Sequence, residues 1–140
     1  MIPLHFEIHI NASSSKVWST LWEEHNYRKW AESLNKGSYY KGDLSKGSKI
    51  YFFDSNQNGM YNLVVENRPN KEMTFKHLGW MENAQESPQS WIDSMEQYLL
   101  NENKDGTLLR VKVQALEEFS DFFQKKYPSM LLAIKELAES

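Results

Sequence analysis

The chain has 140 residues, of which 40% are hydrophobic and 14% aromatic, so it can bury one sizeable core and is not a disordered tail. Its formal net charge is −3, with 16 Lys and Arg against 19 Asp and Glu, and neither half is basic. Nucleic acid backbones are bound by clustered positive charge, so we expect no nucleic acid partner. The absence of cysteine excludes disulfides, thiolate nucleophiles and cysteine-type zinc sites.

The beginning of the chain has no features of a targeting segment. Residues Met1–Ile10 alternate apolar and polar side chains, and no apolar run in the sequence approaches the roughly 18 residues of a membrane span. No linker, internal repeat or low-complexity tract divides the chain. We therefore expect a cytoplasmic protein with no membrane insertion, folded as one domain over residues 1–140.

The first elements are a strand and two short helices. The alternation in Leu4–Ile10 predicts a strand with one buried face. The stretch Asn11–Ser15 offers hydroxyl groups that can cap a helix, and the spacing of apolar residues then predicts helices over Ser14–Trp22 and His25–Ala31. On the polar face of the first strand lie His5, Glu7 and His9, whose neighbours would be about 6.8 Å apart along the strand, too far to converge on one ion. We therefore expect no metal site there.

The middle of the chain consists of strands joined by turns and loops. Residues 35–47 are polar and contain glycine, which predicts a loop with at most one short strand at Ser38–Lys41. Residues Met81–Gln89 are polar and contain Pro88, and they predict a wide loop at the rim of a sheet. The further predicted strands are Lys49–Asp54, Met60–Asn67, Glu72–Trp80, Trp91–Asn101 and Thr107–Ala115.

The last stretch, Phe119–Ala138, predicts one long amphipathic helix. Its apolar residues recur at steps of three and four: Phe119, Phe123, Tyr127, Met130, Ile134 and Leu137. Pro128 lacks an N–H group and crowds the carbonyl of Gln124, so we expect a kink or a restart there. A helix with one apolar stripe needs a covering sheet. The order of elements predicts an α+β helix-grip fold, in which a curved antiparallel sheet of six to seven strands wraps around the C-terminal helix.

Several stretches resemble a known superfamily: FEIHINASSSKVW at residues 6–18, VENRP at 65–69, MTFKH at 73–77, DGTLL at 105–109 and AIKEL at 133–137. Together with Trp30, they resemble the SRPBCC superfamily, which has the START-like helix-grip fold. The branch that they resemble most is the C-terminal domain of the Aha-type activator of the heat-shock chaperone ATPase. The resemblance implies a largely apolar cavity between sheet and helix, which the superfamily uses for lipids, polyketides and other hydrophobic molecules, and in a minority of members for catalysis.

Residues predicted to face such a cavity come from the strands and from the helix stripe. They are Tyr51, Phe53, Tyr61, Phe75, His77, Tyr98, Leu100, Phe123, Tyr127 and Met130. The alternative for each is plain packing in a filled core. For Ile50–Phe53 the sequence does not decide which side chains face inward, because both faces of that strand would be apolar.

His77 and Glu96 are the candidates for acid–base chemistry. His77 ends the alternation Met73, Phe75, His77, and Glu96 can share a face with Tyr98, so both could lie in a water-poor cavity with shifted pKa values. A histidine at the rim, or a glutamate on the outer face of the sheet, is the simpler interpretation and the one that we favour from sequence.

Three hypotheses for the function follow. The first is a domain that binds a hydrophobic or aromatic small molecule, such as a lipid or polyketide-like compound, without a cofactor. The second is an enzyme of the cyclase or dehydratase type that uses His77 in the same cavity. The third is a protein-binding module similar to the chaperone activator. The sequence leaves a monomer and a homodimer equally open.

Overall fold

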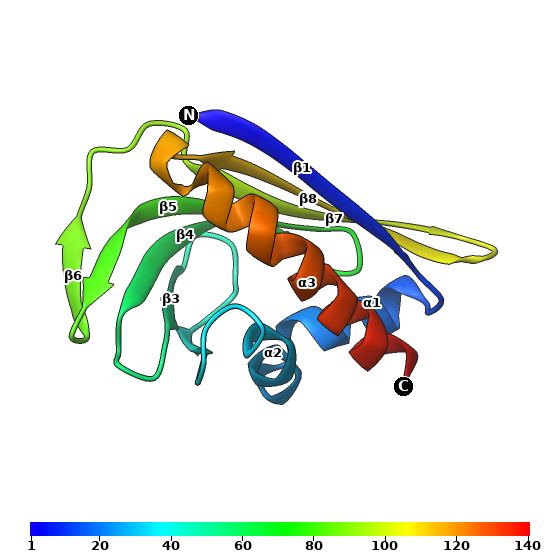
Figure 1. Ribbon diagram of the computed structural model, residues 1–140. Helices are drawn as coiled ribbons and strands as arrows, with labels where there is room; N and C mark the ends of the chain where they lie inside the picture. Colours follow the sequence, from blue (N-terminus) through cyan, green and yellow to red (C-terminus); the bar gives the residue numbers. More distant parts are fainter.

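The computed structural model describes all 140 residues and contains one eight-stranded sheet, three α-helices and a short 3-10 helix (Figure 1). The elements in chain order are β1 (Ile2–Ile10), α1 (Ser14–Trp22), α2 (Glu24–Ala31), β2 (Tyr39–Gly42), β3 (Lys49–Phe53), β4 (Gly59–Arg68), β5 (Glu72–Glu82), β6 (Gln85–Pro88), β7 (Met95–Asn103), β8 (Gly106–Ala115), η1 (Glu117–Phe119) and α3 (Ser120–Glu139). Two short helices follow the first strand and one long helix ends the chain. The predicted α+β helix-grip fold is therefore confirmed.

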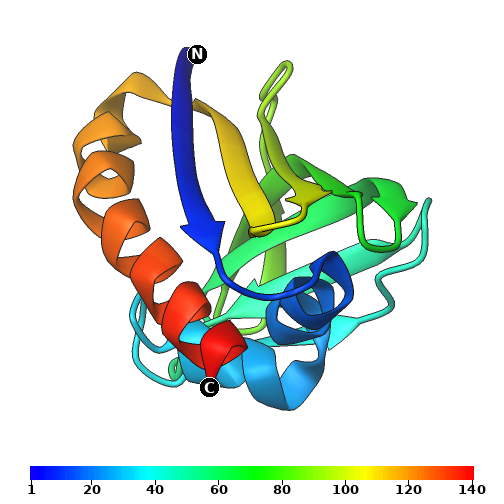
Figure 2. The same ribbon diagram turned by 90° about the vertical axis from the view of Figure 1, so that its right-hand side faces the viewer.

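The sheet has the strand order β1-β8-β7-β5-β4-β3-β2, and β6 pairs with the end of β5. All strand pairs are antiparallel. The first strand of the chain therefore lies beside the last one, at one edge of the sheet. The helix α3 crosses one face of the sheet, and α1 and α2 lie near its C-terminal end (Figures 1 and 2).

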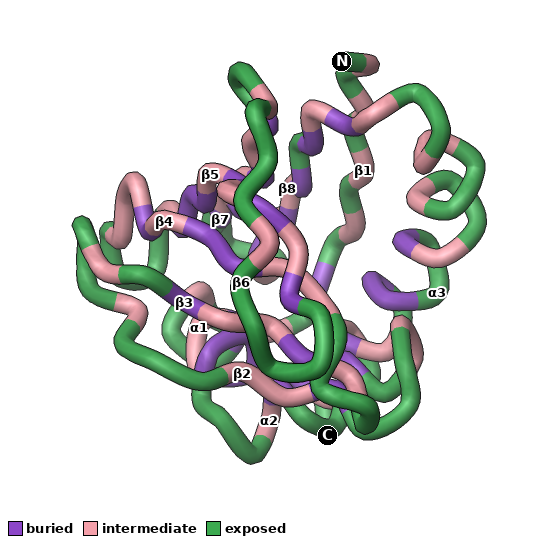
Figure 3. The backbone as a smooth tube through the Cα atoms, turned by 90° about the vertical axis from the view of Figure 1, so that its left-hand side faces the viewer, coloured by how far each residue is buried: buried purple, intermediate pink, exposed green.

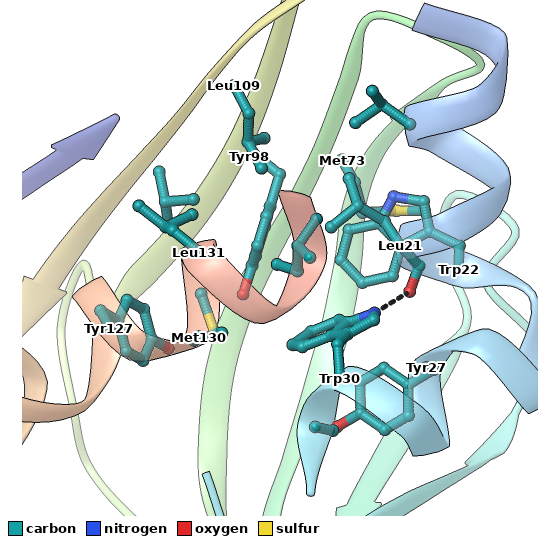
Figure 4. Close-up of a cluster of buried hydrophobic side chains, with 14 of the residues drawn as sticks. Leu21, Trp22, Tyr27, Trp30, Met73, Tyr98, Leu109, Tyr127, Met130 and Leu131 are labelled. Atoms are coloured by element: carbon teal, nitrogen blue, oxygen red, sulfur yellow. Dashed lines mark hydrogen bonds between the residues drawn. The ribbon is translucent and has the colours of Figure 1, made fainter. Parts of the chain in front are cut away.

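The two short helices are fixed to each other at the end of α1. The predicted cap is confirmed, because the Ser13 hydroxyl accepts a hydrogen bond from the Lys16 backbone N–H at 3.1 Å. One residue, Glu23, separates the helices, and the Trp30 indole Nε1 donates to the Thr20 and Leu21 carbonyls at 3.0 and 3.2 Å (Figure 4). These two hydrogen bonds satisfy carbonyl groups in the last turn of α1, which have no partner within the helix.

The main core lies between the inner face of the sheet and the three helices (Figure 3). On β8, Leu109, Val111 and Val113 alternate with polar residues and are buried, as predicted from the sequence. From α3, Ile134 is fully buried among them. Burying one such aliphatic side chain contributes about 1.5–3 kcal/mol, so these inward rows hold α3 against the sheet.

The helix α3 continues without a break through Pro128, so the predicted restart is wrong. Proline removes one N–H group and one helical hydrogen bond. Packing offsets this loss, because Tyr127, Met130 and Leu131, next to Pro128 in the helix, are all buried against the core. None of the helices is both long and apolar enough to cross a membrane.

The predicted wide loop at Met81–Gln89 is also wrong. Strand β5 continues to Glu82, turns through Asn83 and Ala84, both of positive φ, and returns as β6. This hairpin is mostly exposed and stands away from the body of the sheet (Figures 1 and 3). Strand β7 begins at Met95 rather than at Trp91. The loop that precedes it covers residues 89–94 and not residues 81–89.

Candidate ligand-binding cavity

A cavity of about 180 Å³ lies within the core, between the inner face of the sheet, the short helices and α3. Its apolar and aromatic lining consists of Trp22, Tyr27, Trp30, Leu34, Phe52, Phe53, Met60, Phe75, Tyr98, Phe122, Phe123 and Tyr127. Its polar lining consists of Asn35, Ser38, Asp54, Asn58, Asn62, His77 and Glu96. No Lys or Arg contributes to the wall. We call this space the inner chamber.

A second hollow of about 270 Å³ adjoins the inner chamber, and we call it the outer chamber. Met60, His77 and Phe123 are among the residues that border both chambers. The outer chamber is walled by Trp80, whose ring centroid lies 5.0 Å from that of Trp91 and 5.5 Å from that of Phe119. The two hollows form a ring-lined space with few polar groups, the usual character of a small-molecule pocket.

A bulge between β4 and β5 positions His77 and Asn62. The register passes from Tyr61 opposite Gly79 to Asn62 opposite His77, which leaves Leu78 without a partner. The bulge therefore places Asn62 and His77 side by side on the inner face. Nδ1 of His77 lies 2.6 Å from the Asn62 amide oxygen, and both side chains are buried.

Glu96 enters the same space from β7, where it lies opposite Phe75 of β5. Its carboxylate accepts hydrogen bonds from the Tyr98 hydroxyl at 2.5 Å and from the Tyr127 hydroxyl at 2.9 Å to each oxygen. Oε1 of Glu96 lies 3.7 Å from Nε2 of His77. Strands β4, β5 and β7 and helix α3 thus bring five polar side chains to one end of the inner chamber. Figure 4 shows the inward positions of Tyr98 and Tyr127.

Burial controls the ionisation of this polar cluster. Removal from water raises the pKa of Glu96, although the two tyrosine hydroxyls act in the opposite direction. Burial lowers the pKa of His77 from 6.5 to about 4, so its imidazole is neutral at pH 7. The pKa values of Tyr98 and Tyr127 rise well above 10, first through burial and then through the neighbouring Glu96 charge. The cluster can therefore offer hydrogen-bond acceptors, a neutral base and a carboxyl group in a water-poor space.

Six of the residues predicted for the cavity line the inner chamber: Phe53, Phe75, His77, Tyr98, Phe123 and Tyr127. Leu100 and Met130 are buried in the main core without bordering either chamber. Glu96 lines the inner chamber beside His77, so the simpler interpretation of a rim histidine or an outer glutamate is wrong about their positions. Their predicted chemistry is a separate question.

The predicted placement of Tyr51 and Tyr61 in the cavity is wrong, and Phe53 borders the inner chamber although its ring lies with theirs. These rings belong to a second cluster, together with Met81, on the opposite face of the sheet. Ile50 and Phe52, their neighbours on β3, take the inward positions. The Phe53 residue borders the inner chamber at its edge, but its ring stacks on Tyr51 and Tyr39. Aromatic residues at successive positions give no parity signal, which is why the sequence did not settle the face.

Several lining residues were not predicted, chiefly Trp22, Phe52, Asn62, Trp80 and Trp91. Asn62 had a usable signal, because a lone amide in the middle of an otherwise apolar strand is a candidate for a buried partner. Trp22 was predicted to lie in the first helix, but the direction of its side chain was not predicted. Its ring contacts Phe75 and Tyr98, and its Nε1 is buried without a partner. Trp80 and Trp91 depend on the loop at residues 89–94, which the sequence pattern placed in a strand.

A sheet closed over a helix with a ring-lined hollow between them is the architecture of the SRPBCC superfamily, and the resemblance predicted from the sequence is confirmed at the level of the fold. Comparison with profiles of known protein families gives no match, and comparison with curated protein sequences gives none either.

Solved structures are similar over nearly the whole chain. The Aha1 dimer from Colwellia psychrerythraea is 25% identical, with a TM-score of 0.72, covering 99% of this chain and 97% of that one. CalU16 from Micromonospora echinospora is 18% identical, with a TM-score of 0.72, covering 97% of this chain and 65% of that one. DynU16, from the dynemicin biosynthetic locus, is 9% identical, with a TM-score of 0.75, covering 99% of this chain and 47% of that one.

Proposed function

We propose that this protein binds a small hydrophobic molecule with at least one planar ring in the space between the sheet and α3. The observation that carries the proposal is the pair of adjoining hollows, of about 180 and 270 Å³, which reach from the surface to buried rings of the core. A ligand ring placed there would leave water and contact these rings. The similarity to CalU16 and DynU16 agrees with this proposal, since the latter comes from a biosynthetic locus.

The lining favours rings over long acyl chains. Phe75 meets Trp22 and Phe52 at centroid distances of 5.6 and 5.4 Å, and Phe123 meets Tyr127 at 5.0 Å, each pair nearly perpendicular. The edges and faces that these rings present to the inner chamber can make the same kind of contact with a ligand ring. The polar cluster at the inner end can orient a ligand that has one polar group.

Thermal melts with indole, 2-naphthol and decanoate test the proposal. A ligand at about ten times its Kd stabilises the folded state by about 1.4 kcal/mol, so the ring compounds should raise the Tm by several degrees. We expect indole and 2-naphthol to raise it more than decanoate does. A panel in which no ring compound shifts the Tm would overturn the proposal.

A pair of variants on one strand separates binding in the chambers from binding elsewhere. Met60 borders both chambers, so Met60→Trp should fill their junction and abolish the shift in Tm. Leu63, on the opposite face of β4 and opposite Lys49 and Lys76, provides the control, because Leu63→Trp adds the same indole outside the chambers. The control should retain the shift.

A second function, acid–base catalysis of the cyclase or dehydratase type, is supported by one observation. His77 and Glu96 lie 3.7 Å apart within the inner chamber, with pKa values moved in opposite directions by burial. Turnover of a ring-bearing carbonyl compound that is lost in His77→Gln, while binding is retained, would support catalysis over binding alone. The third hypothesis, a protein-binding module, is favoured less, because it predicts a filled core.

A further inference from the structure

With Glu96 ionised, the polar cluster in the inner chamber contains two hydrogen-bond acceptors that face each other. The amide oxygen of Asn62 lies 2.6 Å from Nδ1 of His77, and an amide oxygen can only accept, so Nδ1 carries the proton of the neutral ring. Nε2 then carries no hydrogen and can only accept a hydrogen bond. It faces Oε1 of Glu96 at 3.7 Å, a separation too long for a direct hydrogen bond.

No hydrogen bond of the protein fills the gap between these two atoms, and the one unpartnered donor in the wall, Trp22 Nε1, packs beside Phe75 and Tyr98. The Tyr98 and Tyr127 hydroxyls have one hydrogen each, and both are directed at Glu96. Neither chamber is lined by Lys or Arg, whereas the inner chamber is lined by two carboxyl groups, Glu96 and Asp54. The unmet requirement is therefore for a group with at least two hydrogens and no negative charge.

We propose that the ligand of this cavity carries a primary amino group on its ring-bearing body, and that this group binds between Nε2 of His77 and Oε1 of Glu96. This inference rests on the proposed function, because it specifies the polar end of the same ligand. An ammonium group has three hydrogens, so it can donate to both acceptors at once, and Glu96 supplies the opposite charge. A hydroxyl has one hydrogen and can satisfy only one of them.

The surrounding rings add to this preference. Tyr127 and Phe123 border the chamber with their rings 5.0 Å apart and nearly perpendicular, and the faces of such rings attract cations. A ligand carboxylate would instead approach Glu96 with no cation in the wall to offset the repulsion. The cavity should therefore discriminate against acids with the same body.

Calorimetric titration with three indole compounds of similar size tests the inference: tryptamine, tryptophol and indole-3-acetate. We expect tryptamine to bind about tenfold more tightly than tryptophol, and indole-3-acetate to bind at least about thirtyfold more weakly than tryptamine. Tryptophol binding as tightly as tryptamine, or indole-3-acetate binding most tightly, would overturn the amine assignment while leaving the proposed function standing. If none of the three binds and no ring compound shifts the Tm, the proposed function fails as well.

Two matched variants localise the effect. Glu96→Gln should weaken tryptamine about thirtyfold and change tryptophol by less than about threefold. Glu86→Gln makes the same change of net charge at another glutamate that accepts from a tyrosine hydroxyl, but this residue lies on the outer face of the sheet. It should leave all three affinities within about twofold. Equal losses in the two variants would overturn the inference. Should Glu96→Gln fail to fold, His77→Gln replaces it, with loss of the preference for tryptamine expected.

Discussion

The two faces of the sheet carry the same chemical pair, a glutamate that accepts from tyrosine, in opposite surroundings. On the inner face, Glu96 accepts from Tyr98 and Tyr127 and is buried, and its pKa is raised because burial removes water from the carboxylate. On the outer face, Glu86 accepts from the Tyr51 hydroxyl at 2.8 Å and from Lys49, and these partners lower its pKa. Burial outweighs the hydrogen bonds at Glu96, whereas at Glu86 the hydrogen bonds from Tyr51 and Lys49 outweigh burial.

The aromatic rings differ between the two faces in the same way. The inner rings meet at steep angles around a hollow, for example Trp22 and Tyr98 at 82°, whereas Tyr51 and Phe53 on the outer face stack at 10°. The outer rings Phe53 and Tyr61 form one buried cluster with Met81, against which Tyr51 packs. The perpendicular inner rings leave room for a further ring, and the polar cluster beside them lacks a donor. The inner face therefore combines buried rings with a buried polar cluster, whereas the hollow on the outer face, beside Tyr51 and Glu86, is shallow and solvent-exposed.

The largest expected difference between the faces is in stability. Phe75 is 2% exposed and packs against Trp22, Phe52 and Tyr98, so Phe75→Ala should lower the free energy of unfolding by about 3–5 kcal/mol. Tyr51 is partly exposed, and Tyr51→Ala should cost about 1 kcal/mol. Denaturant titrations with matched slopes measure both values. Equal losses would remove the distinction between the faces.

The next effect concerns the dependence of stability on pH through His77. Its pKa is about 4 in the folded state and about 6.5 when unfolded, so between these values the unfolded state binds more protons. The stability that depends on neutral His77 is therefore complete above pH 6.5 and lost as the pH falls toward 4, by up to about 3 kcal/mol. Unfolding free energies at pH 4, 5, 6 and 7 measure it, and His77→Gln should remove this component. If the unfolding free energy of the variant depended on pH as strongly as that of the wild type, the imidazole would not be buried.

Glu96 should act in the opposite direction. Because burial raises its folded-state pKa, the folded state holds the proton more tightly, and stability falls as the pH rises through that pKa. Glu96→Gln removes this loss, so the Tm of the variant minus that of wild type should increase from pH 4 to pH 8, by roughly 4 °C for each kcal/mol. A difference that decreases with pH would mean that Glu96 is stabilised in its charged form.

The smallest effect is expected at the outer pair. The pKa of Glu86 is lowered through Tyr51 and then Lys49, so its stabilising contribution is present at neutral pH and lost on acidification. The Lys49 side chain is about half exposed, and solvent screens the pair, so Glu86→Gln should lower the Tm at pH 7 by less than about 2 °C. In 1 M salt the decrease should vanish. A large decrease, insensitive to salt, would mean that the outer pair resembles the inner one.

The sequence predicted the fold well because the strongest patterns in it are structural. The alternation of Leu109, Val111 and Val113, the cap at Ser13 and the helix stripe around Ile134 each specify an element and a buried face. Strand β6 could not be predicted, because Gln85–Pro88 has no apolar face and is a strand only through its pairing with β5. Tyr51 and Tyr61 were placed on the wrong face because aromatic residues occupy both parities of β3 and apolar residues occupy both parities of β4.

The polar cluster depends on contacts between distant segments. An inward position of His77 and Glu96 was considered from sequence but not favoured, and their meeting requires the neighbouring register of β5 and β7. The contact of His77 with Asn62 requires the bulge at Leu78, which no local pattern indicates. The hollow is still less visible in sequence, because the same rings can fill a core or surround a space.

The two faces also provide the most direct test, because each carries a methionine. Met60 borders both chambers, and Met81 lies with Phe53 and Tyr61 on the opposite face of the sheet. With the methionine methyl groups labelled with ¹³C, titration with indole, which carries no charged group, reports on both faces in one NMR spectrum. We expect the Met60 signal to shift and saturate while the Met81 signal stays unchanged. A saturating shift at Met81, or none at Met60, would contradict a binding site between the sheet and α3.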